Sequence, residues 1–193
     1  MDKAVLISIQ PKWCELIANG VKTVEVRKSR PKLETPFKCY IYCTMPKGEN
    51  DLGLCLDKGI DGSRKKVGLV YKRNYEAANQ MNMPILSGRV IGEFVCDTFI
   101  TDKTFGHDAL FNAAACMSDA EIAAYFVNKE MYGWHISNIV IYDKPKELSE
   151  FRKLNRNCWY ADLGLAKRDC PDCKNADCFL SRPPQSWCYV EVM

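Results

Sequence analysis

Side chains that can do chemistry stand close together near the start of the chain, in residues 20–27 (GVKTVEVR). Lys22, Glu25 and Arg27 supply an ammonium, a carboxylate and a guanidinium, and Thr23 adds a hydroxyl. If the segment is a strand, alternation places Thr23, Glu25 and Arg27 on one face, and Lys22 on the other with the two valines. The octet therefore predicts a charged strand face.

Such a face has three interpretations. The plain one is a solvated surface, because charged residues usually face water. In the second, Lys22 and Glu25 keep each other charged, so that Lys22 and Arg27 meet phosphate and Glu25 accepts from a base amino group. In the third, desolvation lets Lys22 or Glu25 act as a general base on water, with Lys22, Thr23 or Ser8 donating to the developing oxyanion.

The elements that would position this face are short. Residues 4–9 (AVLISI) favour a strand, Pro11 suits the first turn of a helix, and Asn19-Gly20 is a typical helix end. The capping box from Ser118 to Glu121 predicts a helix over 119–128 that buries Ile122, Tyr125 and Phe126. Further strands are expected at 22–27, 37–44, 88–100, 132–142 and 185–192.

Two of these strands carry expectations about packing. In the strand over 37–44, Cys39 and Cys43 share a face and are expected in the core. In the strand over 88–100, Val90, Phe94 and Cys96 are expected on one apolar face, beside a bulge at Gly92.

The pattern predicts an α+β protein of one domain over residues 1–193, with about six strands and three short helices. The expected strands do not alternate with long helices. This favours a mostly antiparallel barrel or sandwich with helices at its openings. Residues 45–87 and the cysteine-rich loop 158–182 are interpreted as insertions. The basic run Arg64–Lys66 in the first is either a solvated loop or a phosphate contact.

The eleven cysteines are an odd number, and reduced, mostly buried thiols are expected. The pair Cys170 and Cys173 has the spacing of a zinc knuckle. With Cys178, and Cys188 or Cys158 as a fourth ligand, it would form a closed structural zinc site. The alternative is a loop of reduced thiols.

Composition excludes little. The formal net charge of +3 over 193 residues permits an anionic partner without requiring one. No signal peptide or membrane span is recognised, so a soluble, cytoplasmic protein is expected, without a membrane partner and of unknown oligomeric state. Neither histidine belongs to a catalytic motif: His107 is expected in solvent, and His135 packed or stacked on a base.

The motif residues also resemble a known family. Ser8 before a short helix, followed by Gly20, Lys22, Glu25 and Arg27, resembles the G-x-K-x-x-E-x-R signature of ASCH domains, which are PUA-like β-barrels. The segments 133–136 (GWHI), 144–148 (KPKEL) and 184–191 (PQSWCYVE) resemble the same group.

The resemblance implies a cleft at the signature strand that binds RNA or a modified nucleotide or nucleoside. Several ASCH members are small hydrolases, and one branch is similar to N4-acetylcytidine amidohydrolases, whose strand threonine is replaced here by Glu25. The competing expectations are therefore a hydrolase acting on a nucleoside amide or on RNA, with Lys22, Glu25 and Thr23 as catalytic residues, and a protein-interaction adaptor. The expected binding residues are Ser8, Lys22, Glu25, Arg27, Trp134, His135 and Trp187.

Overall fold

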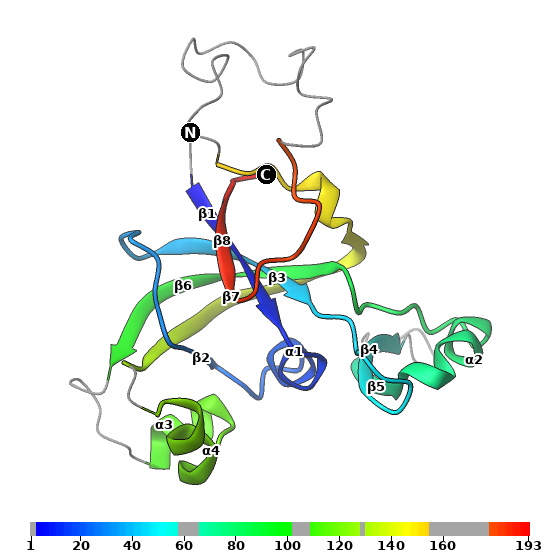
Figure 1. Cartoon of the computed structure of the whole chain (residues 1–193), viewed down its shortest axis with the longest axis horizontal. Coiled ribbons are helices and arrows are strands. Elements are labelled where there is room, and N and C mark those ends of the chain that lie inside the picture. Colours follow the sequence, from blue (N-terminus) through cyan, green and yellow to red (C-terminus); the bar gives the residue numbers. More distant parts are fainter. Residues whose placement is uncertain (1–2, 58–65, 102–108, 128–129, 155–177) are drawn as a thin grey trace.

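The computed structural model describes residues 3–57, 66–101, 109–127, 130–154 and 178–193 of the chain. Its main element is a six-stranded sheet in the order β2-β7-β6-β3-β1-β8. The sheet curls into a half-barrel, with β2 and β8 as its edge strands (Figure 1). Its strands are β1 (Lys3–Ile9), β2 (Val24–Arg27), β3 (Phe37–Cys43), β6 (Val90–Thr101), β7 (Tyr132–Lys146) and β8 (Trp187–Glu191).

The sheet is mixed but mostly antiparallel. Only the β1–β3 pair is parallel among the pairings of this sheet, and the long strands β6 and β7 form its antiparallel centre. The predicted α+β fold with a mostly antiparallel sheet is confirmed. The β7 strand continues past residue 142, where it was expected to end, and stops at Lys146.

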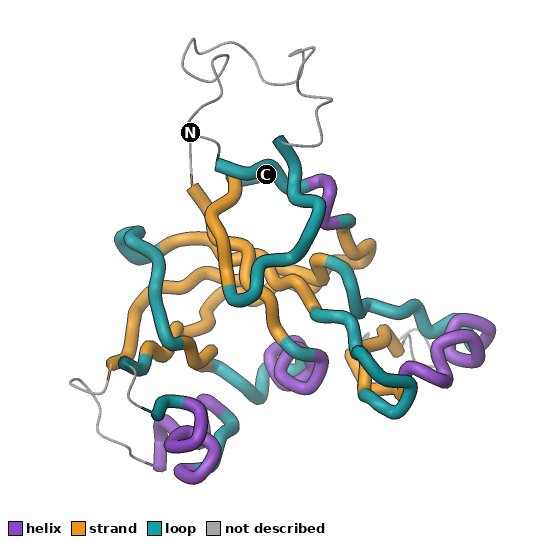
Figure 2. The backbone as a smooth tube through the Cα atoms, in the orientation of Figure 1, coloured by secondary structure: helices purple, strands orange, loops and turns teal. Residues whose placement is uncertain are grey.

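The helices are short and lie around the sheet (Figure 2). As predicted, α1 begins at Pro11, and the chain leaves it at Gly20, whose φ of +74° suits a residue without a Cβ. The Ser118 capping box is confirmed at the start of α4. The helices are α1 (Pro11–Ala18), α2 (Tyr75–Gln80), α3 (Ala109–Ala115) and α4 (Asp119–Tyr125), with the 3₁₀ turns η1 (Lys72–Asn74) and η2 (Leu148–Glu150).

The predicted end of the helix at residue 128 and the predicted burial of Tyr125 were both wrong. The helix α4 ends at Tyr125, and Tyr125 is exposed, with the Lys28 ammonium 4.3 Å from its ring centroid. The α3 helix was not predicted, although its sequence ALFNAAA is rich in helix formers. Its Phe111 and Ala115 pack with Val24 and Ile122 in a small core between β2 and the two helices.

The largest core fills the inside of the half-barrel and contains Cys39 and Cys43 as expected. Phe94 and Cys96 lie in it, but Val90 packs on the other face of the sheet with Tyr40 and Tyr42. The register of β6 shifts between Val90 and Gly92. This irregularity interrupts the alternation that predicted a common face.

The insertion over 45–87 contains a separate hairpin, β4 (Leu52–Asp57) and β5 (Lys66–Tyr71), followed by η1 and α2. The hairpin packs against α1, and Asn19 Nδ2 donates to the Val67 carbonyl at 3.0 Å. Arg64 and Lys65 lie outside the described residues. No helix in the described part of the chain is long and apolar enough to cross a membrane.

The bulged position Gly92 yields a stability prediction. A Cβ there would collide with the backbone carbonyl oxygen of Val140, whereas a Cβ at Gly68 in β5 would meet nothing within 4 Å. Gly92→Ala should therefore lower the free energy of unfolding by about 2 kcal/mol or more. Gly68→Ala should change it by less than about 1 kcal/mol. Urea unfolding followed by circular dichroism measures both, and equal effects would contradict the assigned packing.

Candidate functional site

Lys22 lies in the turn between α1 and β2, not in the strand. The Val21 and Lys22 amides both donate to the Leu16 carbonyl, at 2.8 and 3.1 Å, and β2 begins only at Val24. The Lys22 ammonium therefore reaches Glu25, with Nζ 3.7 Å from Oε2, and donates to the Ala115 carbonyl of α3 at 2.5 Å. The prediction that Lys22 lies on the opposite face from Glu25 was wrong, because the strand alternation does not extend back to Lys22.

Glu25 and Arg27 lie on the inner face of β2 and form a close ion pair. Arg27 Nη2 is 2.9 Å from Glu25 Oε1 and donates to the Ser8 carbonyl at 2.6 Å. Arg27 Nη1 lies 3.4 Å from the Ser186 hydroxyl. Ser8 in turn donates its hydroxyl to the Pro184 carbonyl at 2.7 Å. Arg27 thus joins the edge strand β2 to β1 and to the segment that enters β8.

This buried ion network, defined as Lys22, Glu25 and Arg27, is nearly closed to solvent. The exposed fractions of the three residues are 2%, 5% and 8%. Burial lowers the pKa of Lys22 from its ordinary value, and the neighbouring Glu25 carboxylate raises it in part. The Trp13 ring covers the ammonium, with Nζ 4.8 Å from the ring centroid. Lys22 is therefore closer to losing its proton than an exposed lysine.

Two buried N–H groups on the same face have no hydrogen-bond partner within the described residues: Arg27 Nε and Trp134 Nε1. In the β2–β7 ladder, Glu25 is opposite Trp134 and Arg27 is opposite Tyr132. Residues opposite each other, or two apart along a strand, share a face. Both free donors therefore lie on the inner face, beside the buried ion network, where an acceptor atom would satisfy them.

Aromatic side chains surround Trp134. Its ring centroid lies 6.0 Å from that of Phe37, 5.8 Å from that of Phe99 and 6.1 Å from that of Trp187. Trp134 is fully buried, but Trp187 is half-buried and donates its Nε1–H to the Ser29 hydroxyl at 3.1 Å. Of the two tryptophans predicted to bind, Trp187 is thus the one with an open surface.

A basic segment after β2 was missed by the sequence analysis. Lys28, Arg30 and Lys32 are all exposed. The Arg30 guanidinium lies over the Phe99 ring at 5.3 Å, and the Lys32 amide donates to the Tyr189 hydroxyl at 2.7 Å. The signal was available, since three cations at alternate positions directly follow the motif. Ser29, which accepts from Trp187, lies in the same segment, whereas the Lys28 ammonium lies over the Tyr125 ring of α4.

Two predicted site residues lie apart from the buried ion network. Thr23 is exposed, so its hydroxyl is not on the inner face with Glu25. His135 is half-exposed on the other face of β7 from Trp134, where its Nδ1 lies 2.6 Å from Asp97 Oδ1. Partial burial acts to raise the pKa of Asp97, but the hydrogen bond from His135 lowers this pKa below its ordinary value. This pair belongs to the outside of the sheet.

The predicted zinc site is only partly described. Cys178 and Cys188 lie in the structure, and no group of three possible metal ligands occurs among the described residues. Burial raises the pKa of the Cys188 thiol to about 11, against the effect of Lys153, and this disfavours the thiolate that zinc needs. Zinc stays a prediction, since three of the possible ligands lie outside the described ranges: Cys158, Cys170 and Cys173. His107, which was expected in solvent, also lies outside them.

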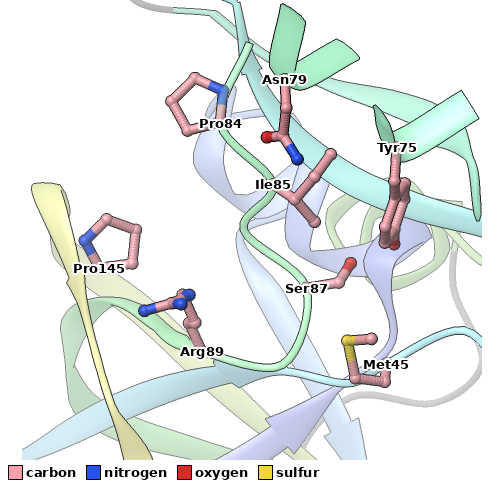
Figure 3. Close-up of a pocket in the computed structure, with 8 residues that line it drawn as sticks. All are labelled: Met45, Tyr75, Asn79, Pro84, Ile85, Ser87, Arg89 and Pro145. Carbon is pink, nitrogen blue, oxygen red and sulfur yellow. The ribbon is translucent and has the colours of Figure 1, made fainter. Parts of the chain in front are cut away.

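A surface pocket of about 490 Å³ lies away from these residues, between the insertion and the end of the main sheet (Figure 3). None of the residues of the buried ion network lines it. Its lining consists of Met45, Tyr75, Asn79, Pro84, Ile85, Ser87, Arg89 and Pro145.

Comparison with known proteins rests on structure alone. No family model matches the sequence, and no curated protein matches it. Among solved structures, ASCH from Zymomonas mobilis superimposes with a TM-score of 0.53 at 14% identity, over 97% of this chain and 87% of that one. A variant of the same protein with a tyrosine changed to phenylalanine gives a TM-score of 0.53 at 14% identity, over 97% and 90% of the two chains. The chain has the ASCH fold.

In this ASCH fold, the predicted signature residues Lys22, Glu25 and Arg27 come together at one place. The helix α1 and the turn after it bring Lys22 to Glu25, and β2 carries Glu25 and Arg27 on its inner face. The third contribution comes from α3, whose Ala115 carbonyl accepts a hydrogen bond from the Lys22 ammonium. The arrangement provides a desolvated amine, a carboxylate and free N–H donors.

The buried ion network yields the second prediction. Glu25→Ala would leave Lys22 and Arg27 buried without their carboxylate, which should cost about 3–5 kcal/mol of unfolding free energy. Glu34→Ala, an exposed glutamate in the loop after β2, should change it by less than about 0.5 kcal/mol. Chemical denaturation of both variants checks this. A Glu25→Ala protein as stable as the parent would contradict the buried pairing.

Proposed function

We propose that this ASCH-fold protein binds RNA or a modified nucleotide on the inner face of β2. The observation that carries the proposal is the buried ion network with two unpaired donors beside it, Arg27 Nε and Trp134 Nε1. Burying three charges is expensive, and a hydrophobic replacement is often as stable. A binding role gives a reason to keep them, because they hold rigid donors toward a polar ligand.

The nucleic-acid chemistry is supported by what surrounds this face. Trp187 offers a partly open aromatic surface on which any base can stack. Lys28, Arg30 and Lys32 are exposed cations that would meet phosphates. Arg27 Nε and Trp134 Nε1 are closed to solvent in the described structure, so in this proposal the nucleotide displaces the side chains that cover them. The two groups then donate to its carbonyl or phosphate oxygens, and Glu25 orients Arg27.

A second candidate is hydrolysis of a nucleoside amide, favoured by the lowered pKa of Lys22. A neutral Lys22 amine would take a proton from water as the water oxygen attacks the amide carbonyl carbon. The developing oxyanion would accept hydrogen bonds from Arg27 Nε or Trp134 Nε1. Collapse of this intermediate breaks the C–N bond, and the leaving amine takes the proton from the Lys22 ammonium.

Trp187 provides the test of binding. Trp187→Ala should weaken binding of a short fluorescein-labelled single-stranded RNA by about 5- to 150-fold, because a base–aromatic stack contributes about 1–3 kcal/mol. Trp187→Phe should restore most of it. Tyr71→Ala removes an exposed aromatic ring on β5 and serves as the matched control, with affinity unchanged. Fluorescence anisotropy gives the affinities, and equal binding by all four proteins would refute the proposed face.

Hydrolysis is tested by incubation with N4-acetylcytidine and with short RNAs, with products read by mass spectrometry. Lys22→Arg keeps the positive charge but cannot supply a neutral base, so it should abolish turnover. In the parent, kcat/KM should rise with pH, because the reactive form of Lys22 is the deprotonated one, and the midpoint should lie below the ordinary 10.5. Turnover by a folded Lys22→Arg protein at the parent rate would exclude this mechanism.

A further inference from the structure

The pocket in Figure 3 is a second place where the structure is shaped for a ligand. It lies where the insertion meets the main sheet, and its volume of about 490 Å³ is within the range of small-molecule sites. The insertion supplies Tyr75 and Asn79 from α2, and β7 supplies Pro145. In the view of Figure 3, Ile85 and Ser87 lie between Tyr75 and Arg89.

The back wall of the pocket is held in place from two sides. The Ser87 hydroxyl accepts from the Leu54 amide at 2.8 Å, and the Leu86 amide donates to the Leu54 carbonyl at 2.8 Å. On the other side, the Cys43 amide donates to the Arg89 carbonyl at 3.0 Å. The segment that carries Ile85, Ser87 and Arg89 is therefore fixed between β4 and β3. A site with such a wall is largely formed before a ligand arrives.

Gly88 leaves the space in which the side chain of Met45, one of the lining residues, lies. Gly88 has a φ of +83°, and the Met45 sulfur lies only 2.8 Å from the place where a Cβ would stand. Any larger residue would displace Met45, and few residues adopt this backbone conformation. Met45, Pro84, Ile85 and Pro145 then give the pocket apolar surfaces, against which a planar ring can pack.

The polar groups of the pocket separate into two kinds. Asn79 is exposed at the pocket and carries an amide that can both donate and accept. Arg89 pairs with Glu147, but a guanidinium has five N–H donors, and the Arg89 side chain is 44% exposed. The combination suits a planar heterocycle that carries an anionic group.

We propose that this pocket binds adenosine monophosphate, either free or as one nucleotide of an RNA strand. The adenine packs against the apolar wall beside Tyr75, the Asn79 amide pairs with the base edge, and Arg89 meets the phosphate. Asparagine is the side chain that pairs with two atoms of adenine, and arginine forms charge-assisted bonds to phosphate. The site uses none of the residues of the buried ion network, so it does not depend on the function proposed above.

Calorimetric titration of the full chain with adenosine monophosphate and with adenosine tests the assignment. Arg89→Gln should weaken binding of the monophosphate at least tenfold and that of adenosine less than twofold, since only the phosphate contact is lost. Asn79→Ala should weaken both ligands by a similar factor. Lys3→Gln, which removes an exposed lysine at the start of β1, should change neither. Thermal unfolding should show all variants folded, because the Arg89–Glu147 pair is exposed.

A competition separates the two sources of the nucleotide. If a short adenine-rich RNA displaces the monophosphate from the parent and from Trp187→Ala alike, the site takes a nucleotide of a strand. If the RNA does not displace it, the ligand is the free nucleotide, and in both cases the proposal holds. Absence of binding by the parent, or binding that survives both Arg89→Gln and Asn79→Ala, would overturn it without bearing on the Trp187 test.

Discussion

One buried carboxylate holds the centre of this structure together. Glu25 lies between Lys22 at 3.7 Å and Arg27 at 2.9 Å, and through these cations it is linked to α3, β1 and the segment entering β8. All three charges are buried, so each depends on the others for compensation. The position of α1, the start of β2 and the closure of the half-barrel therefore rest on the same few contacts.

The closure explains why charges stand where hydrophobic residues would be expected. The strands β2 and β8 are the edges of the sheet, and the described strands show no backbone pairing between them. Arg27 reaches from β2 to the Ser8 carbonyl of β1 and to the Ser186 hydroxyl before β8. A long guanidinium can span this gap and satisfy several acceptors at once, which an apolar side chain cannot do.

The function proposed here would place stability and binding on shared residues at the motif, but not elsewhere. Changes to Lys22, Glu25 or Arg27 act on the fold as well as on any bound nucleotide. Trp187, half-buried at the rim, and Arg89, in the pocket of the insertion, lie outside the buried ion network and report on binding more directly. The insertion itself adds a hairpin and a helix whose contacts with the main sheet create a second, differently composed surface.

The sequence by itself determined the features that depend on neighbouring residues. The start of α1 at Pro11, its end at Asn19-Gly20 and the Ser118 capping box were all predictable, because local hydrogen bonds and spacing specify them. The ASCH fold was predicted from the G-x-K-x-x-E-x-R signature, and the structural comparison bears it out.

Only the tertiary structure decided which way these side chains point and what completes them. Lys22 joins Glu25 because the chain turns before β2, and its third partner, Ala115, is distant in sequence and lies on an unpredicted helix. Val90 changed faces at a bulge, and the pocket required α2 and β7 to meet. These outcomes depend on contacts between distant segments, and neither periodicity nor spacing along one segment records such contacts.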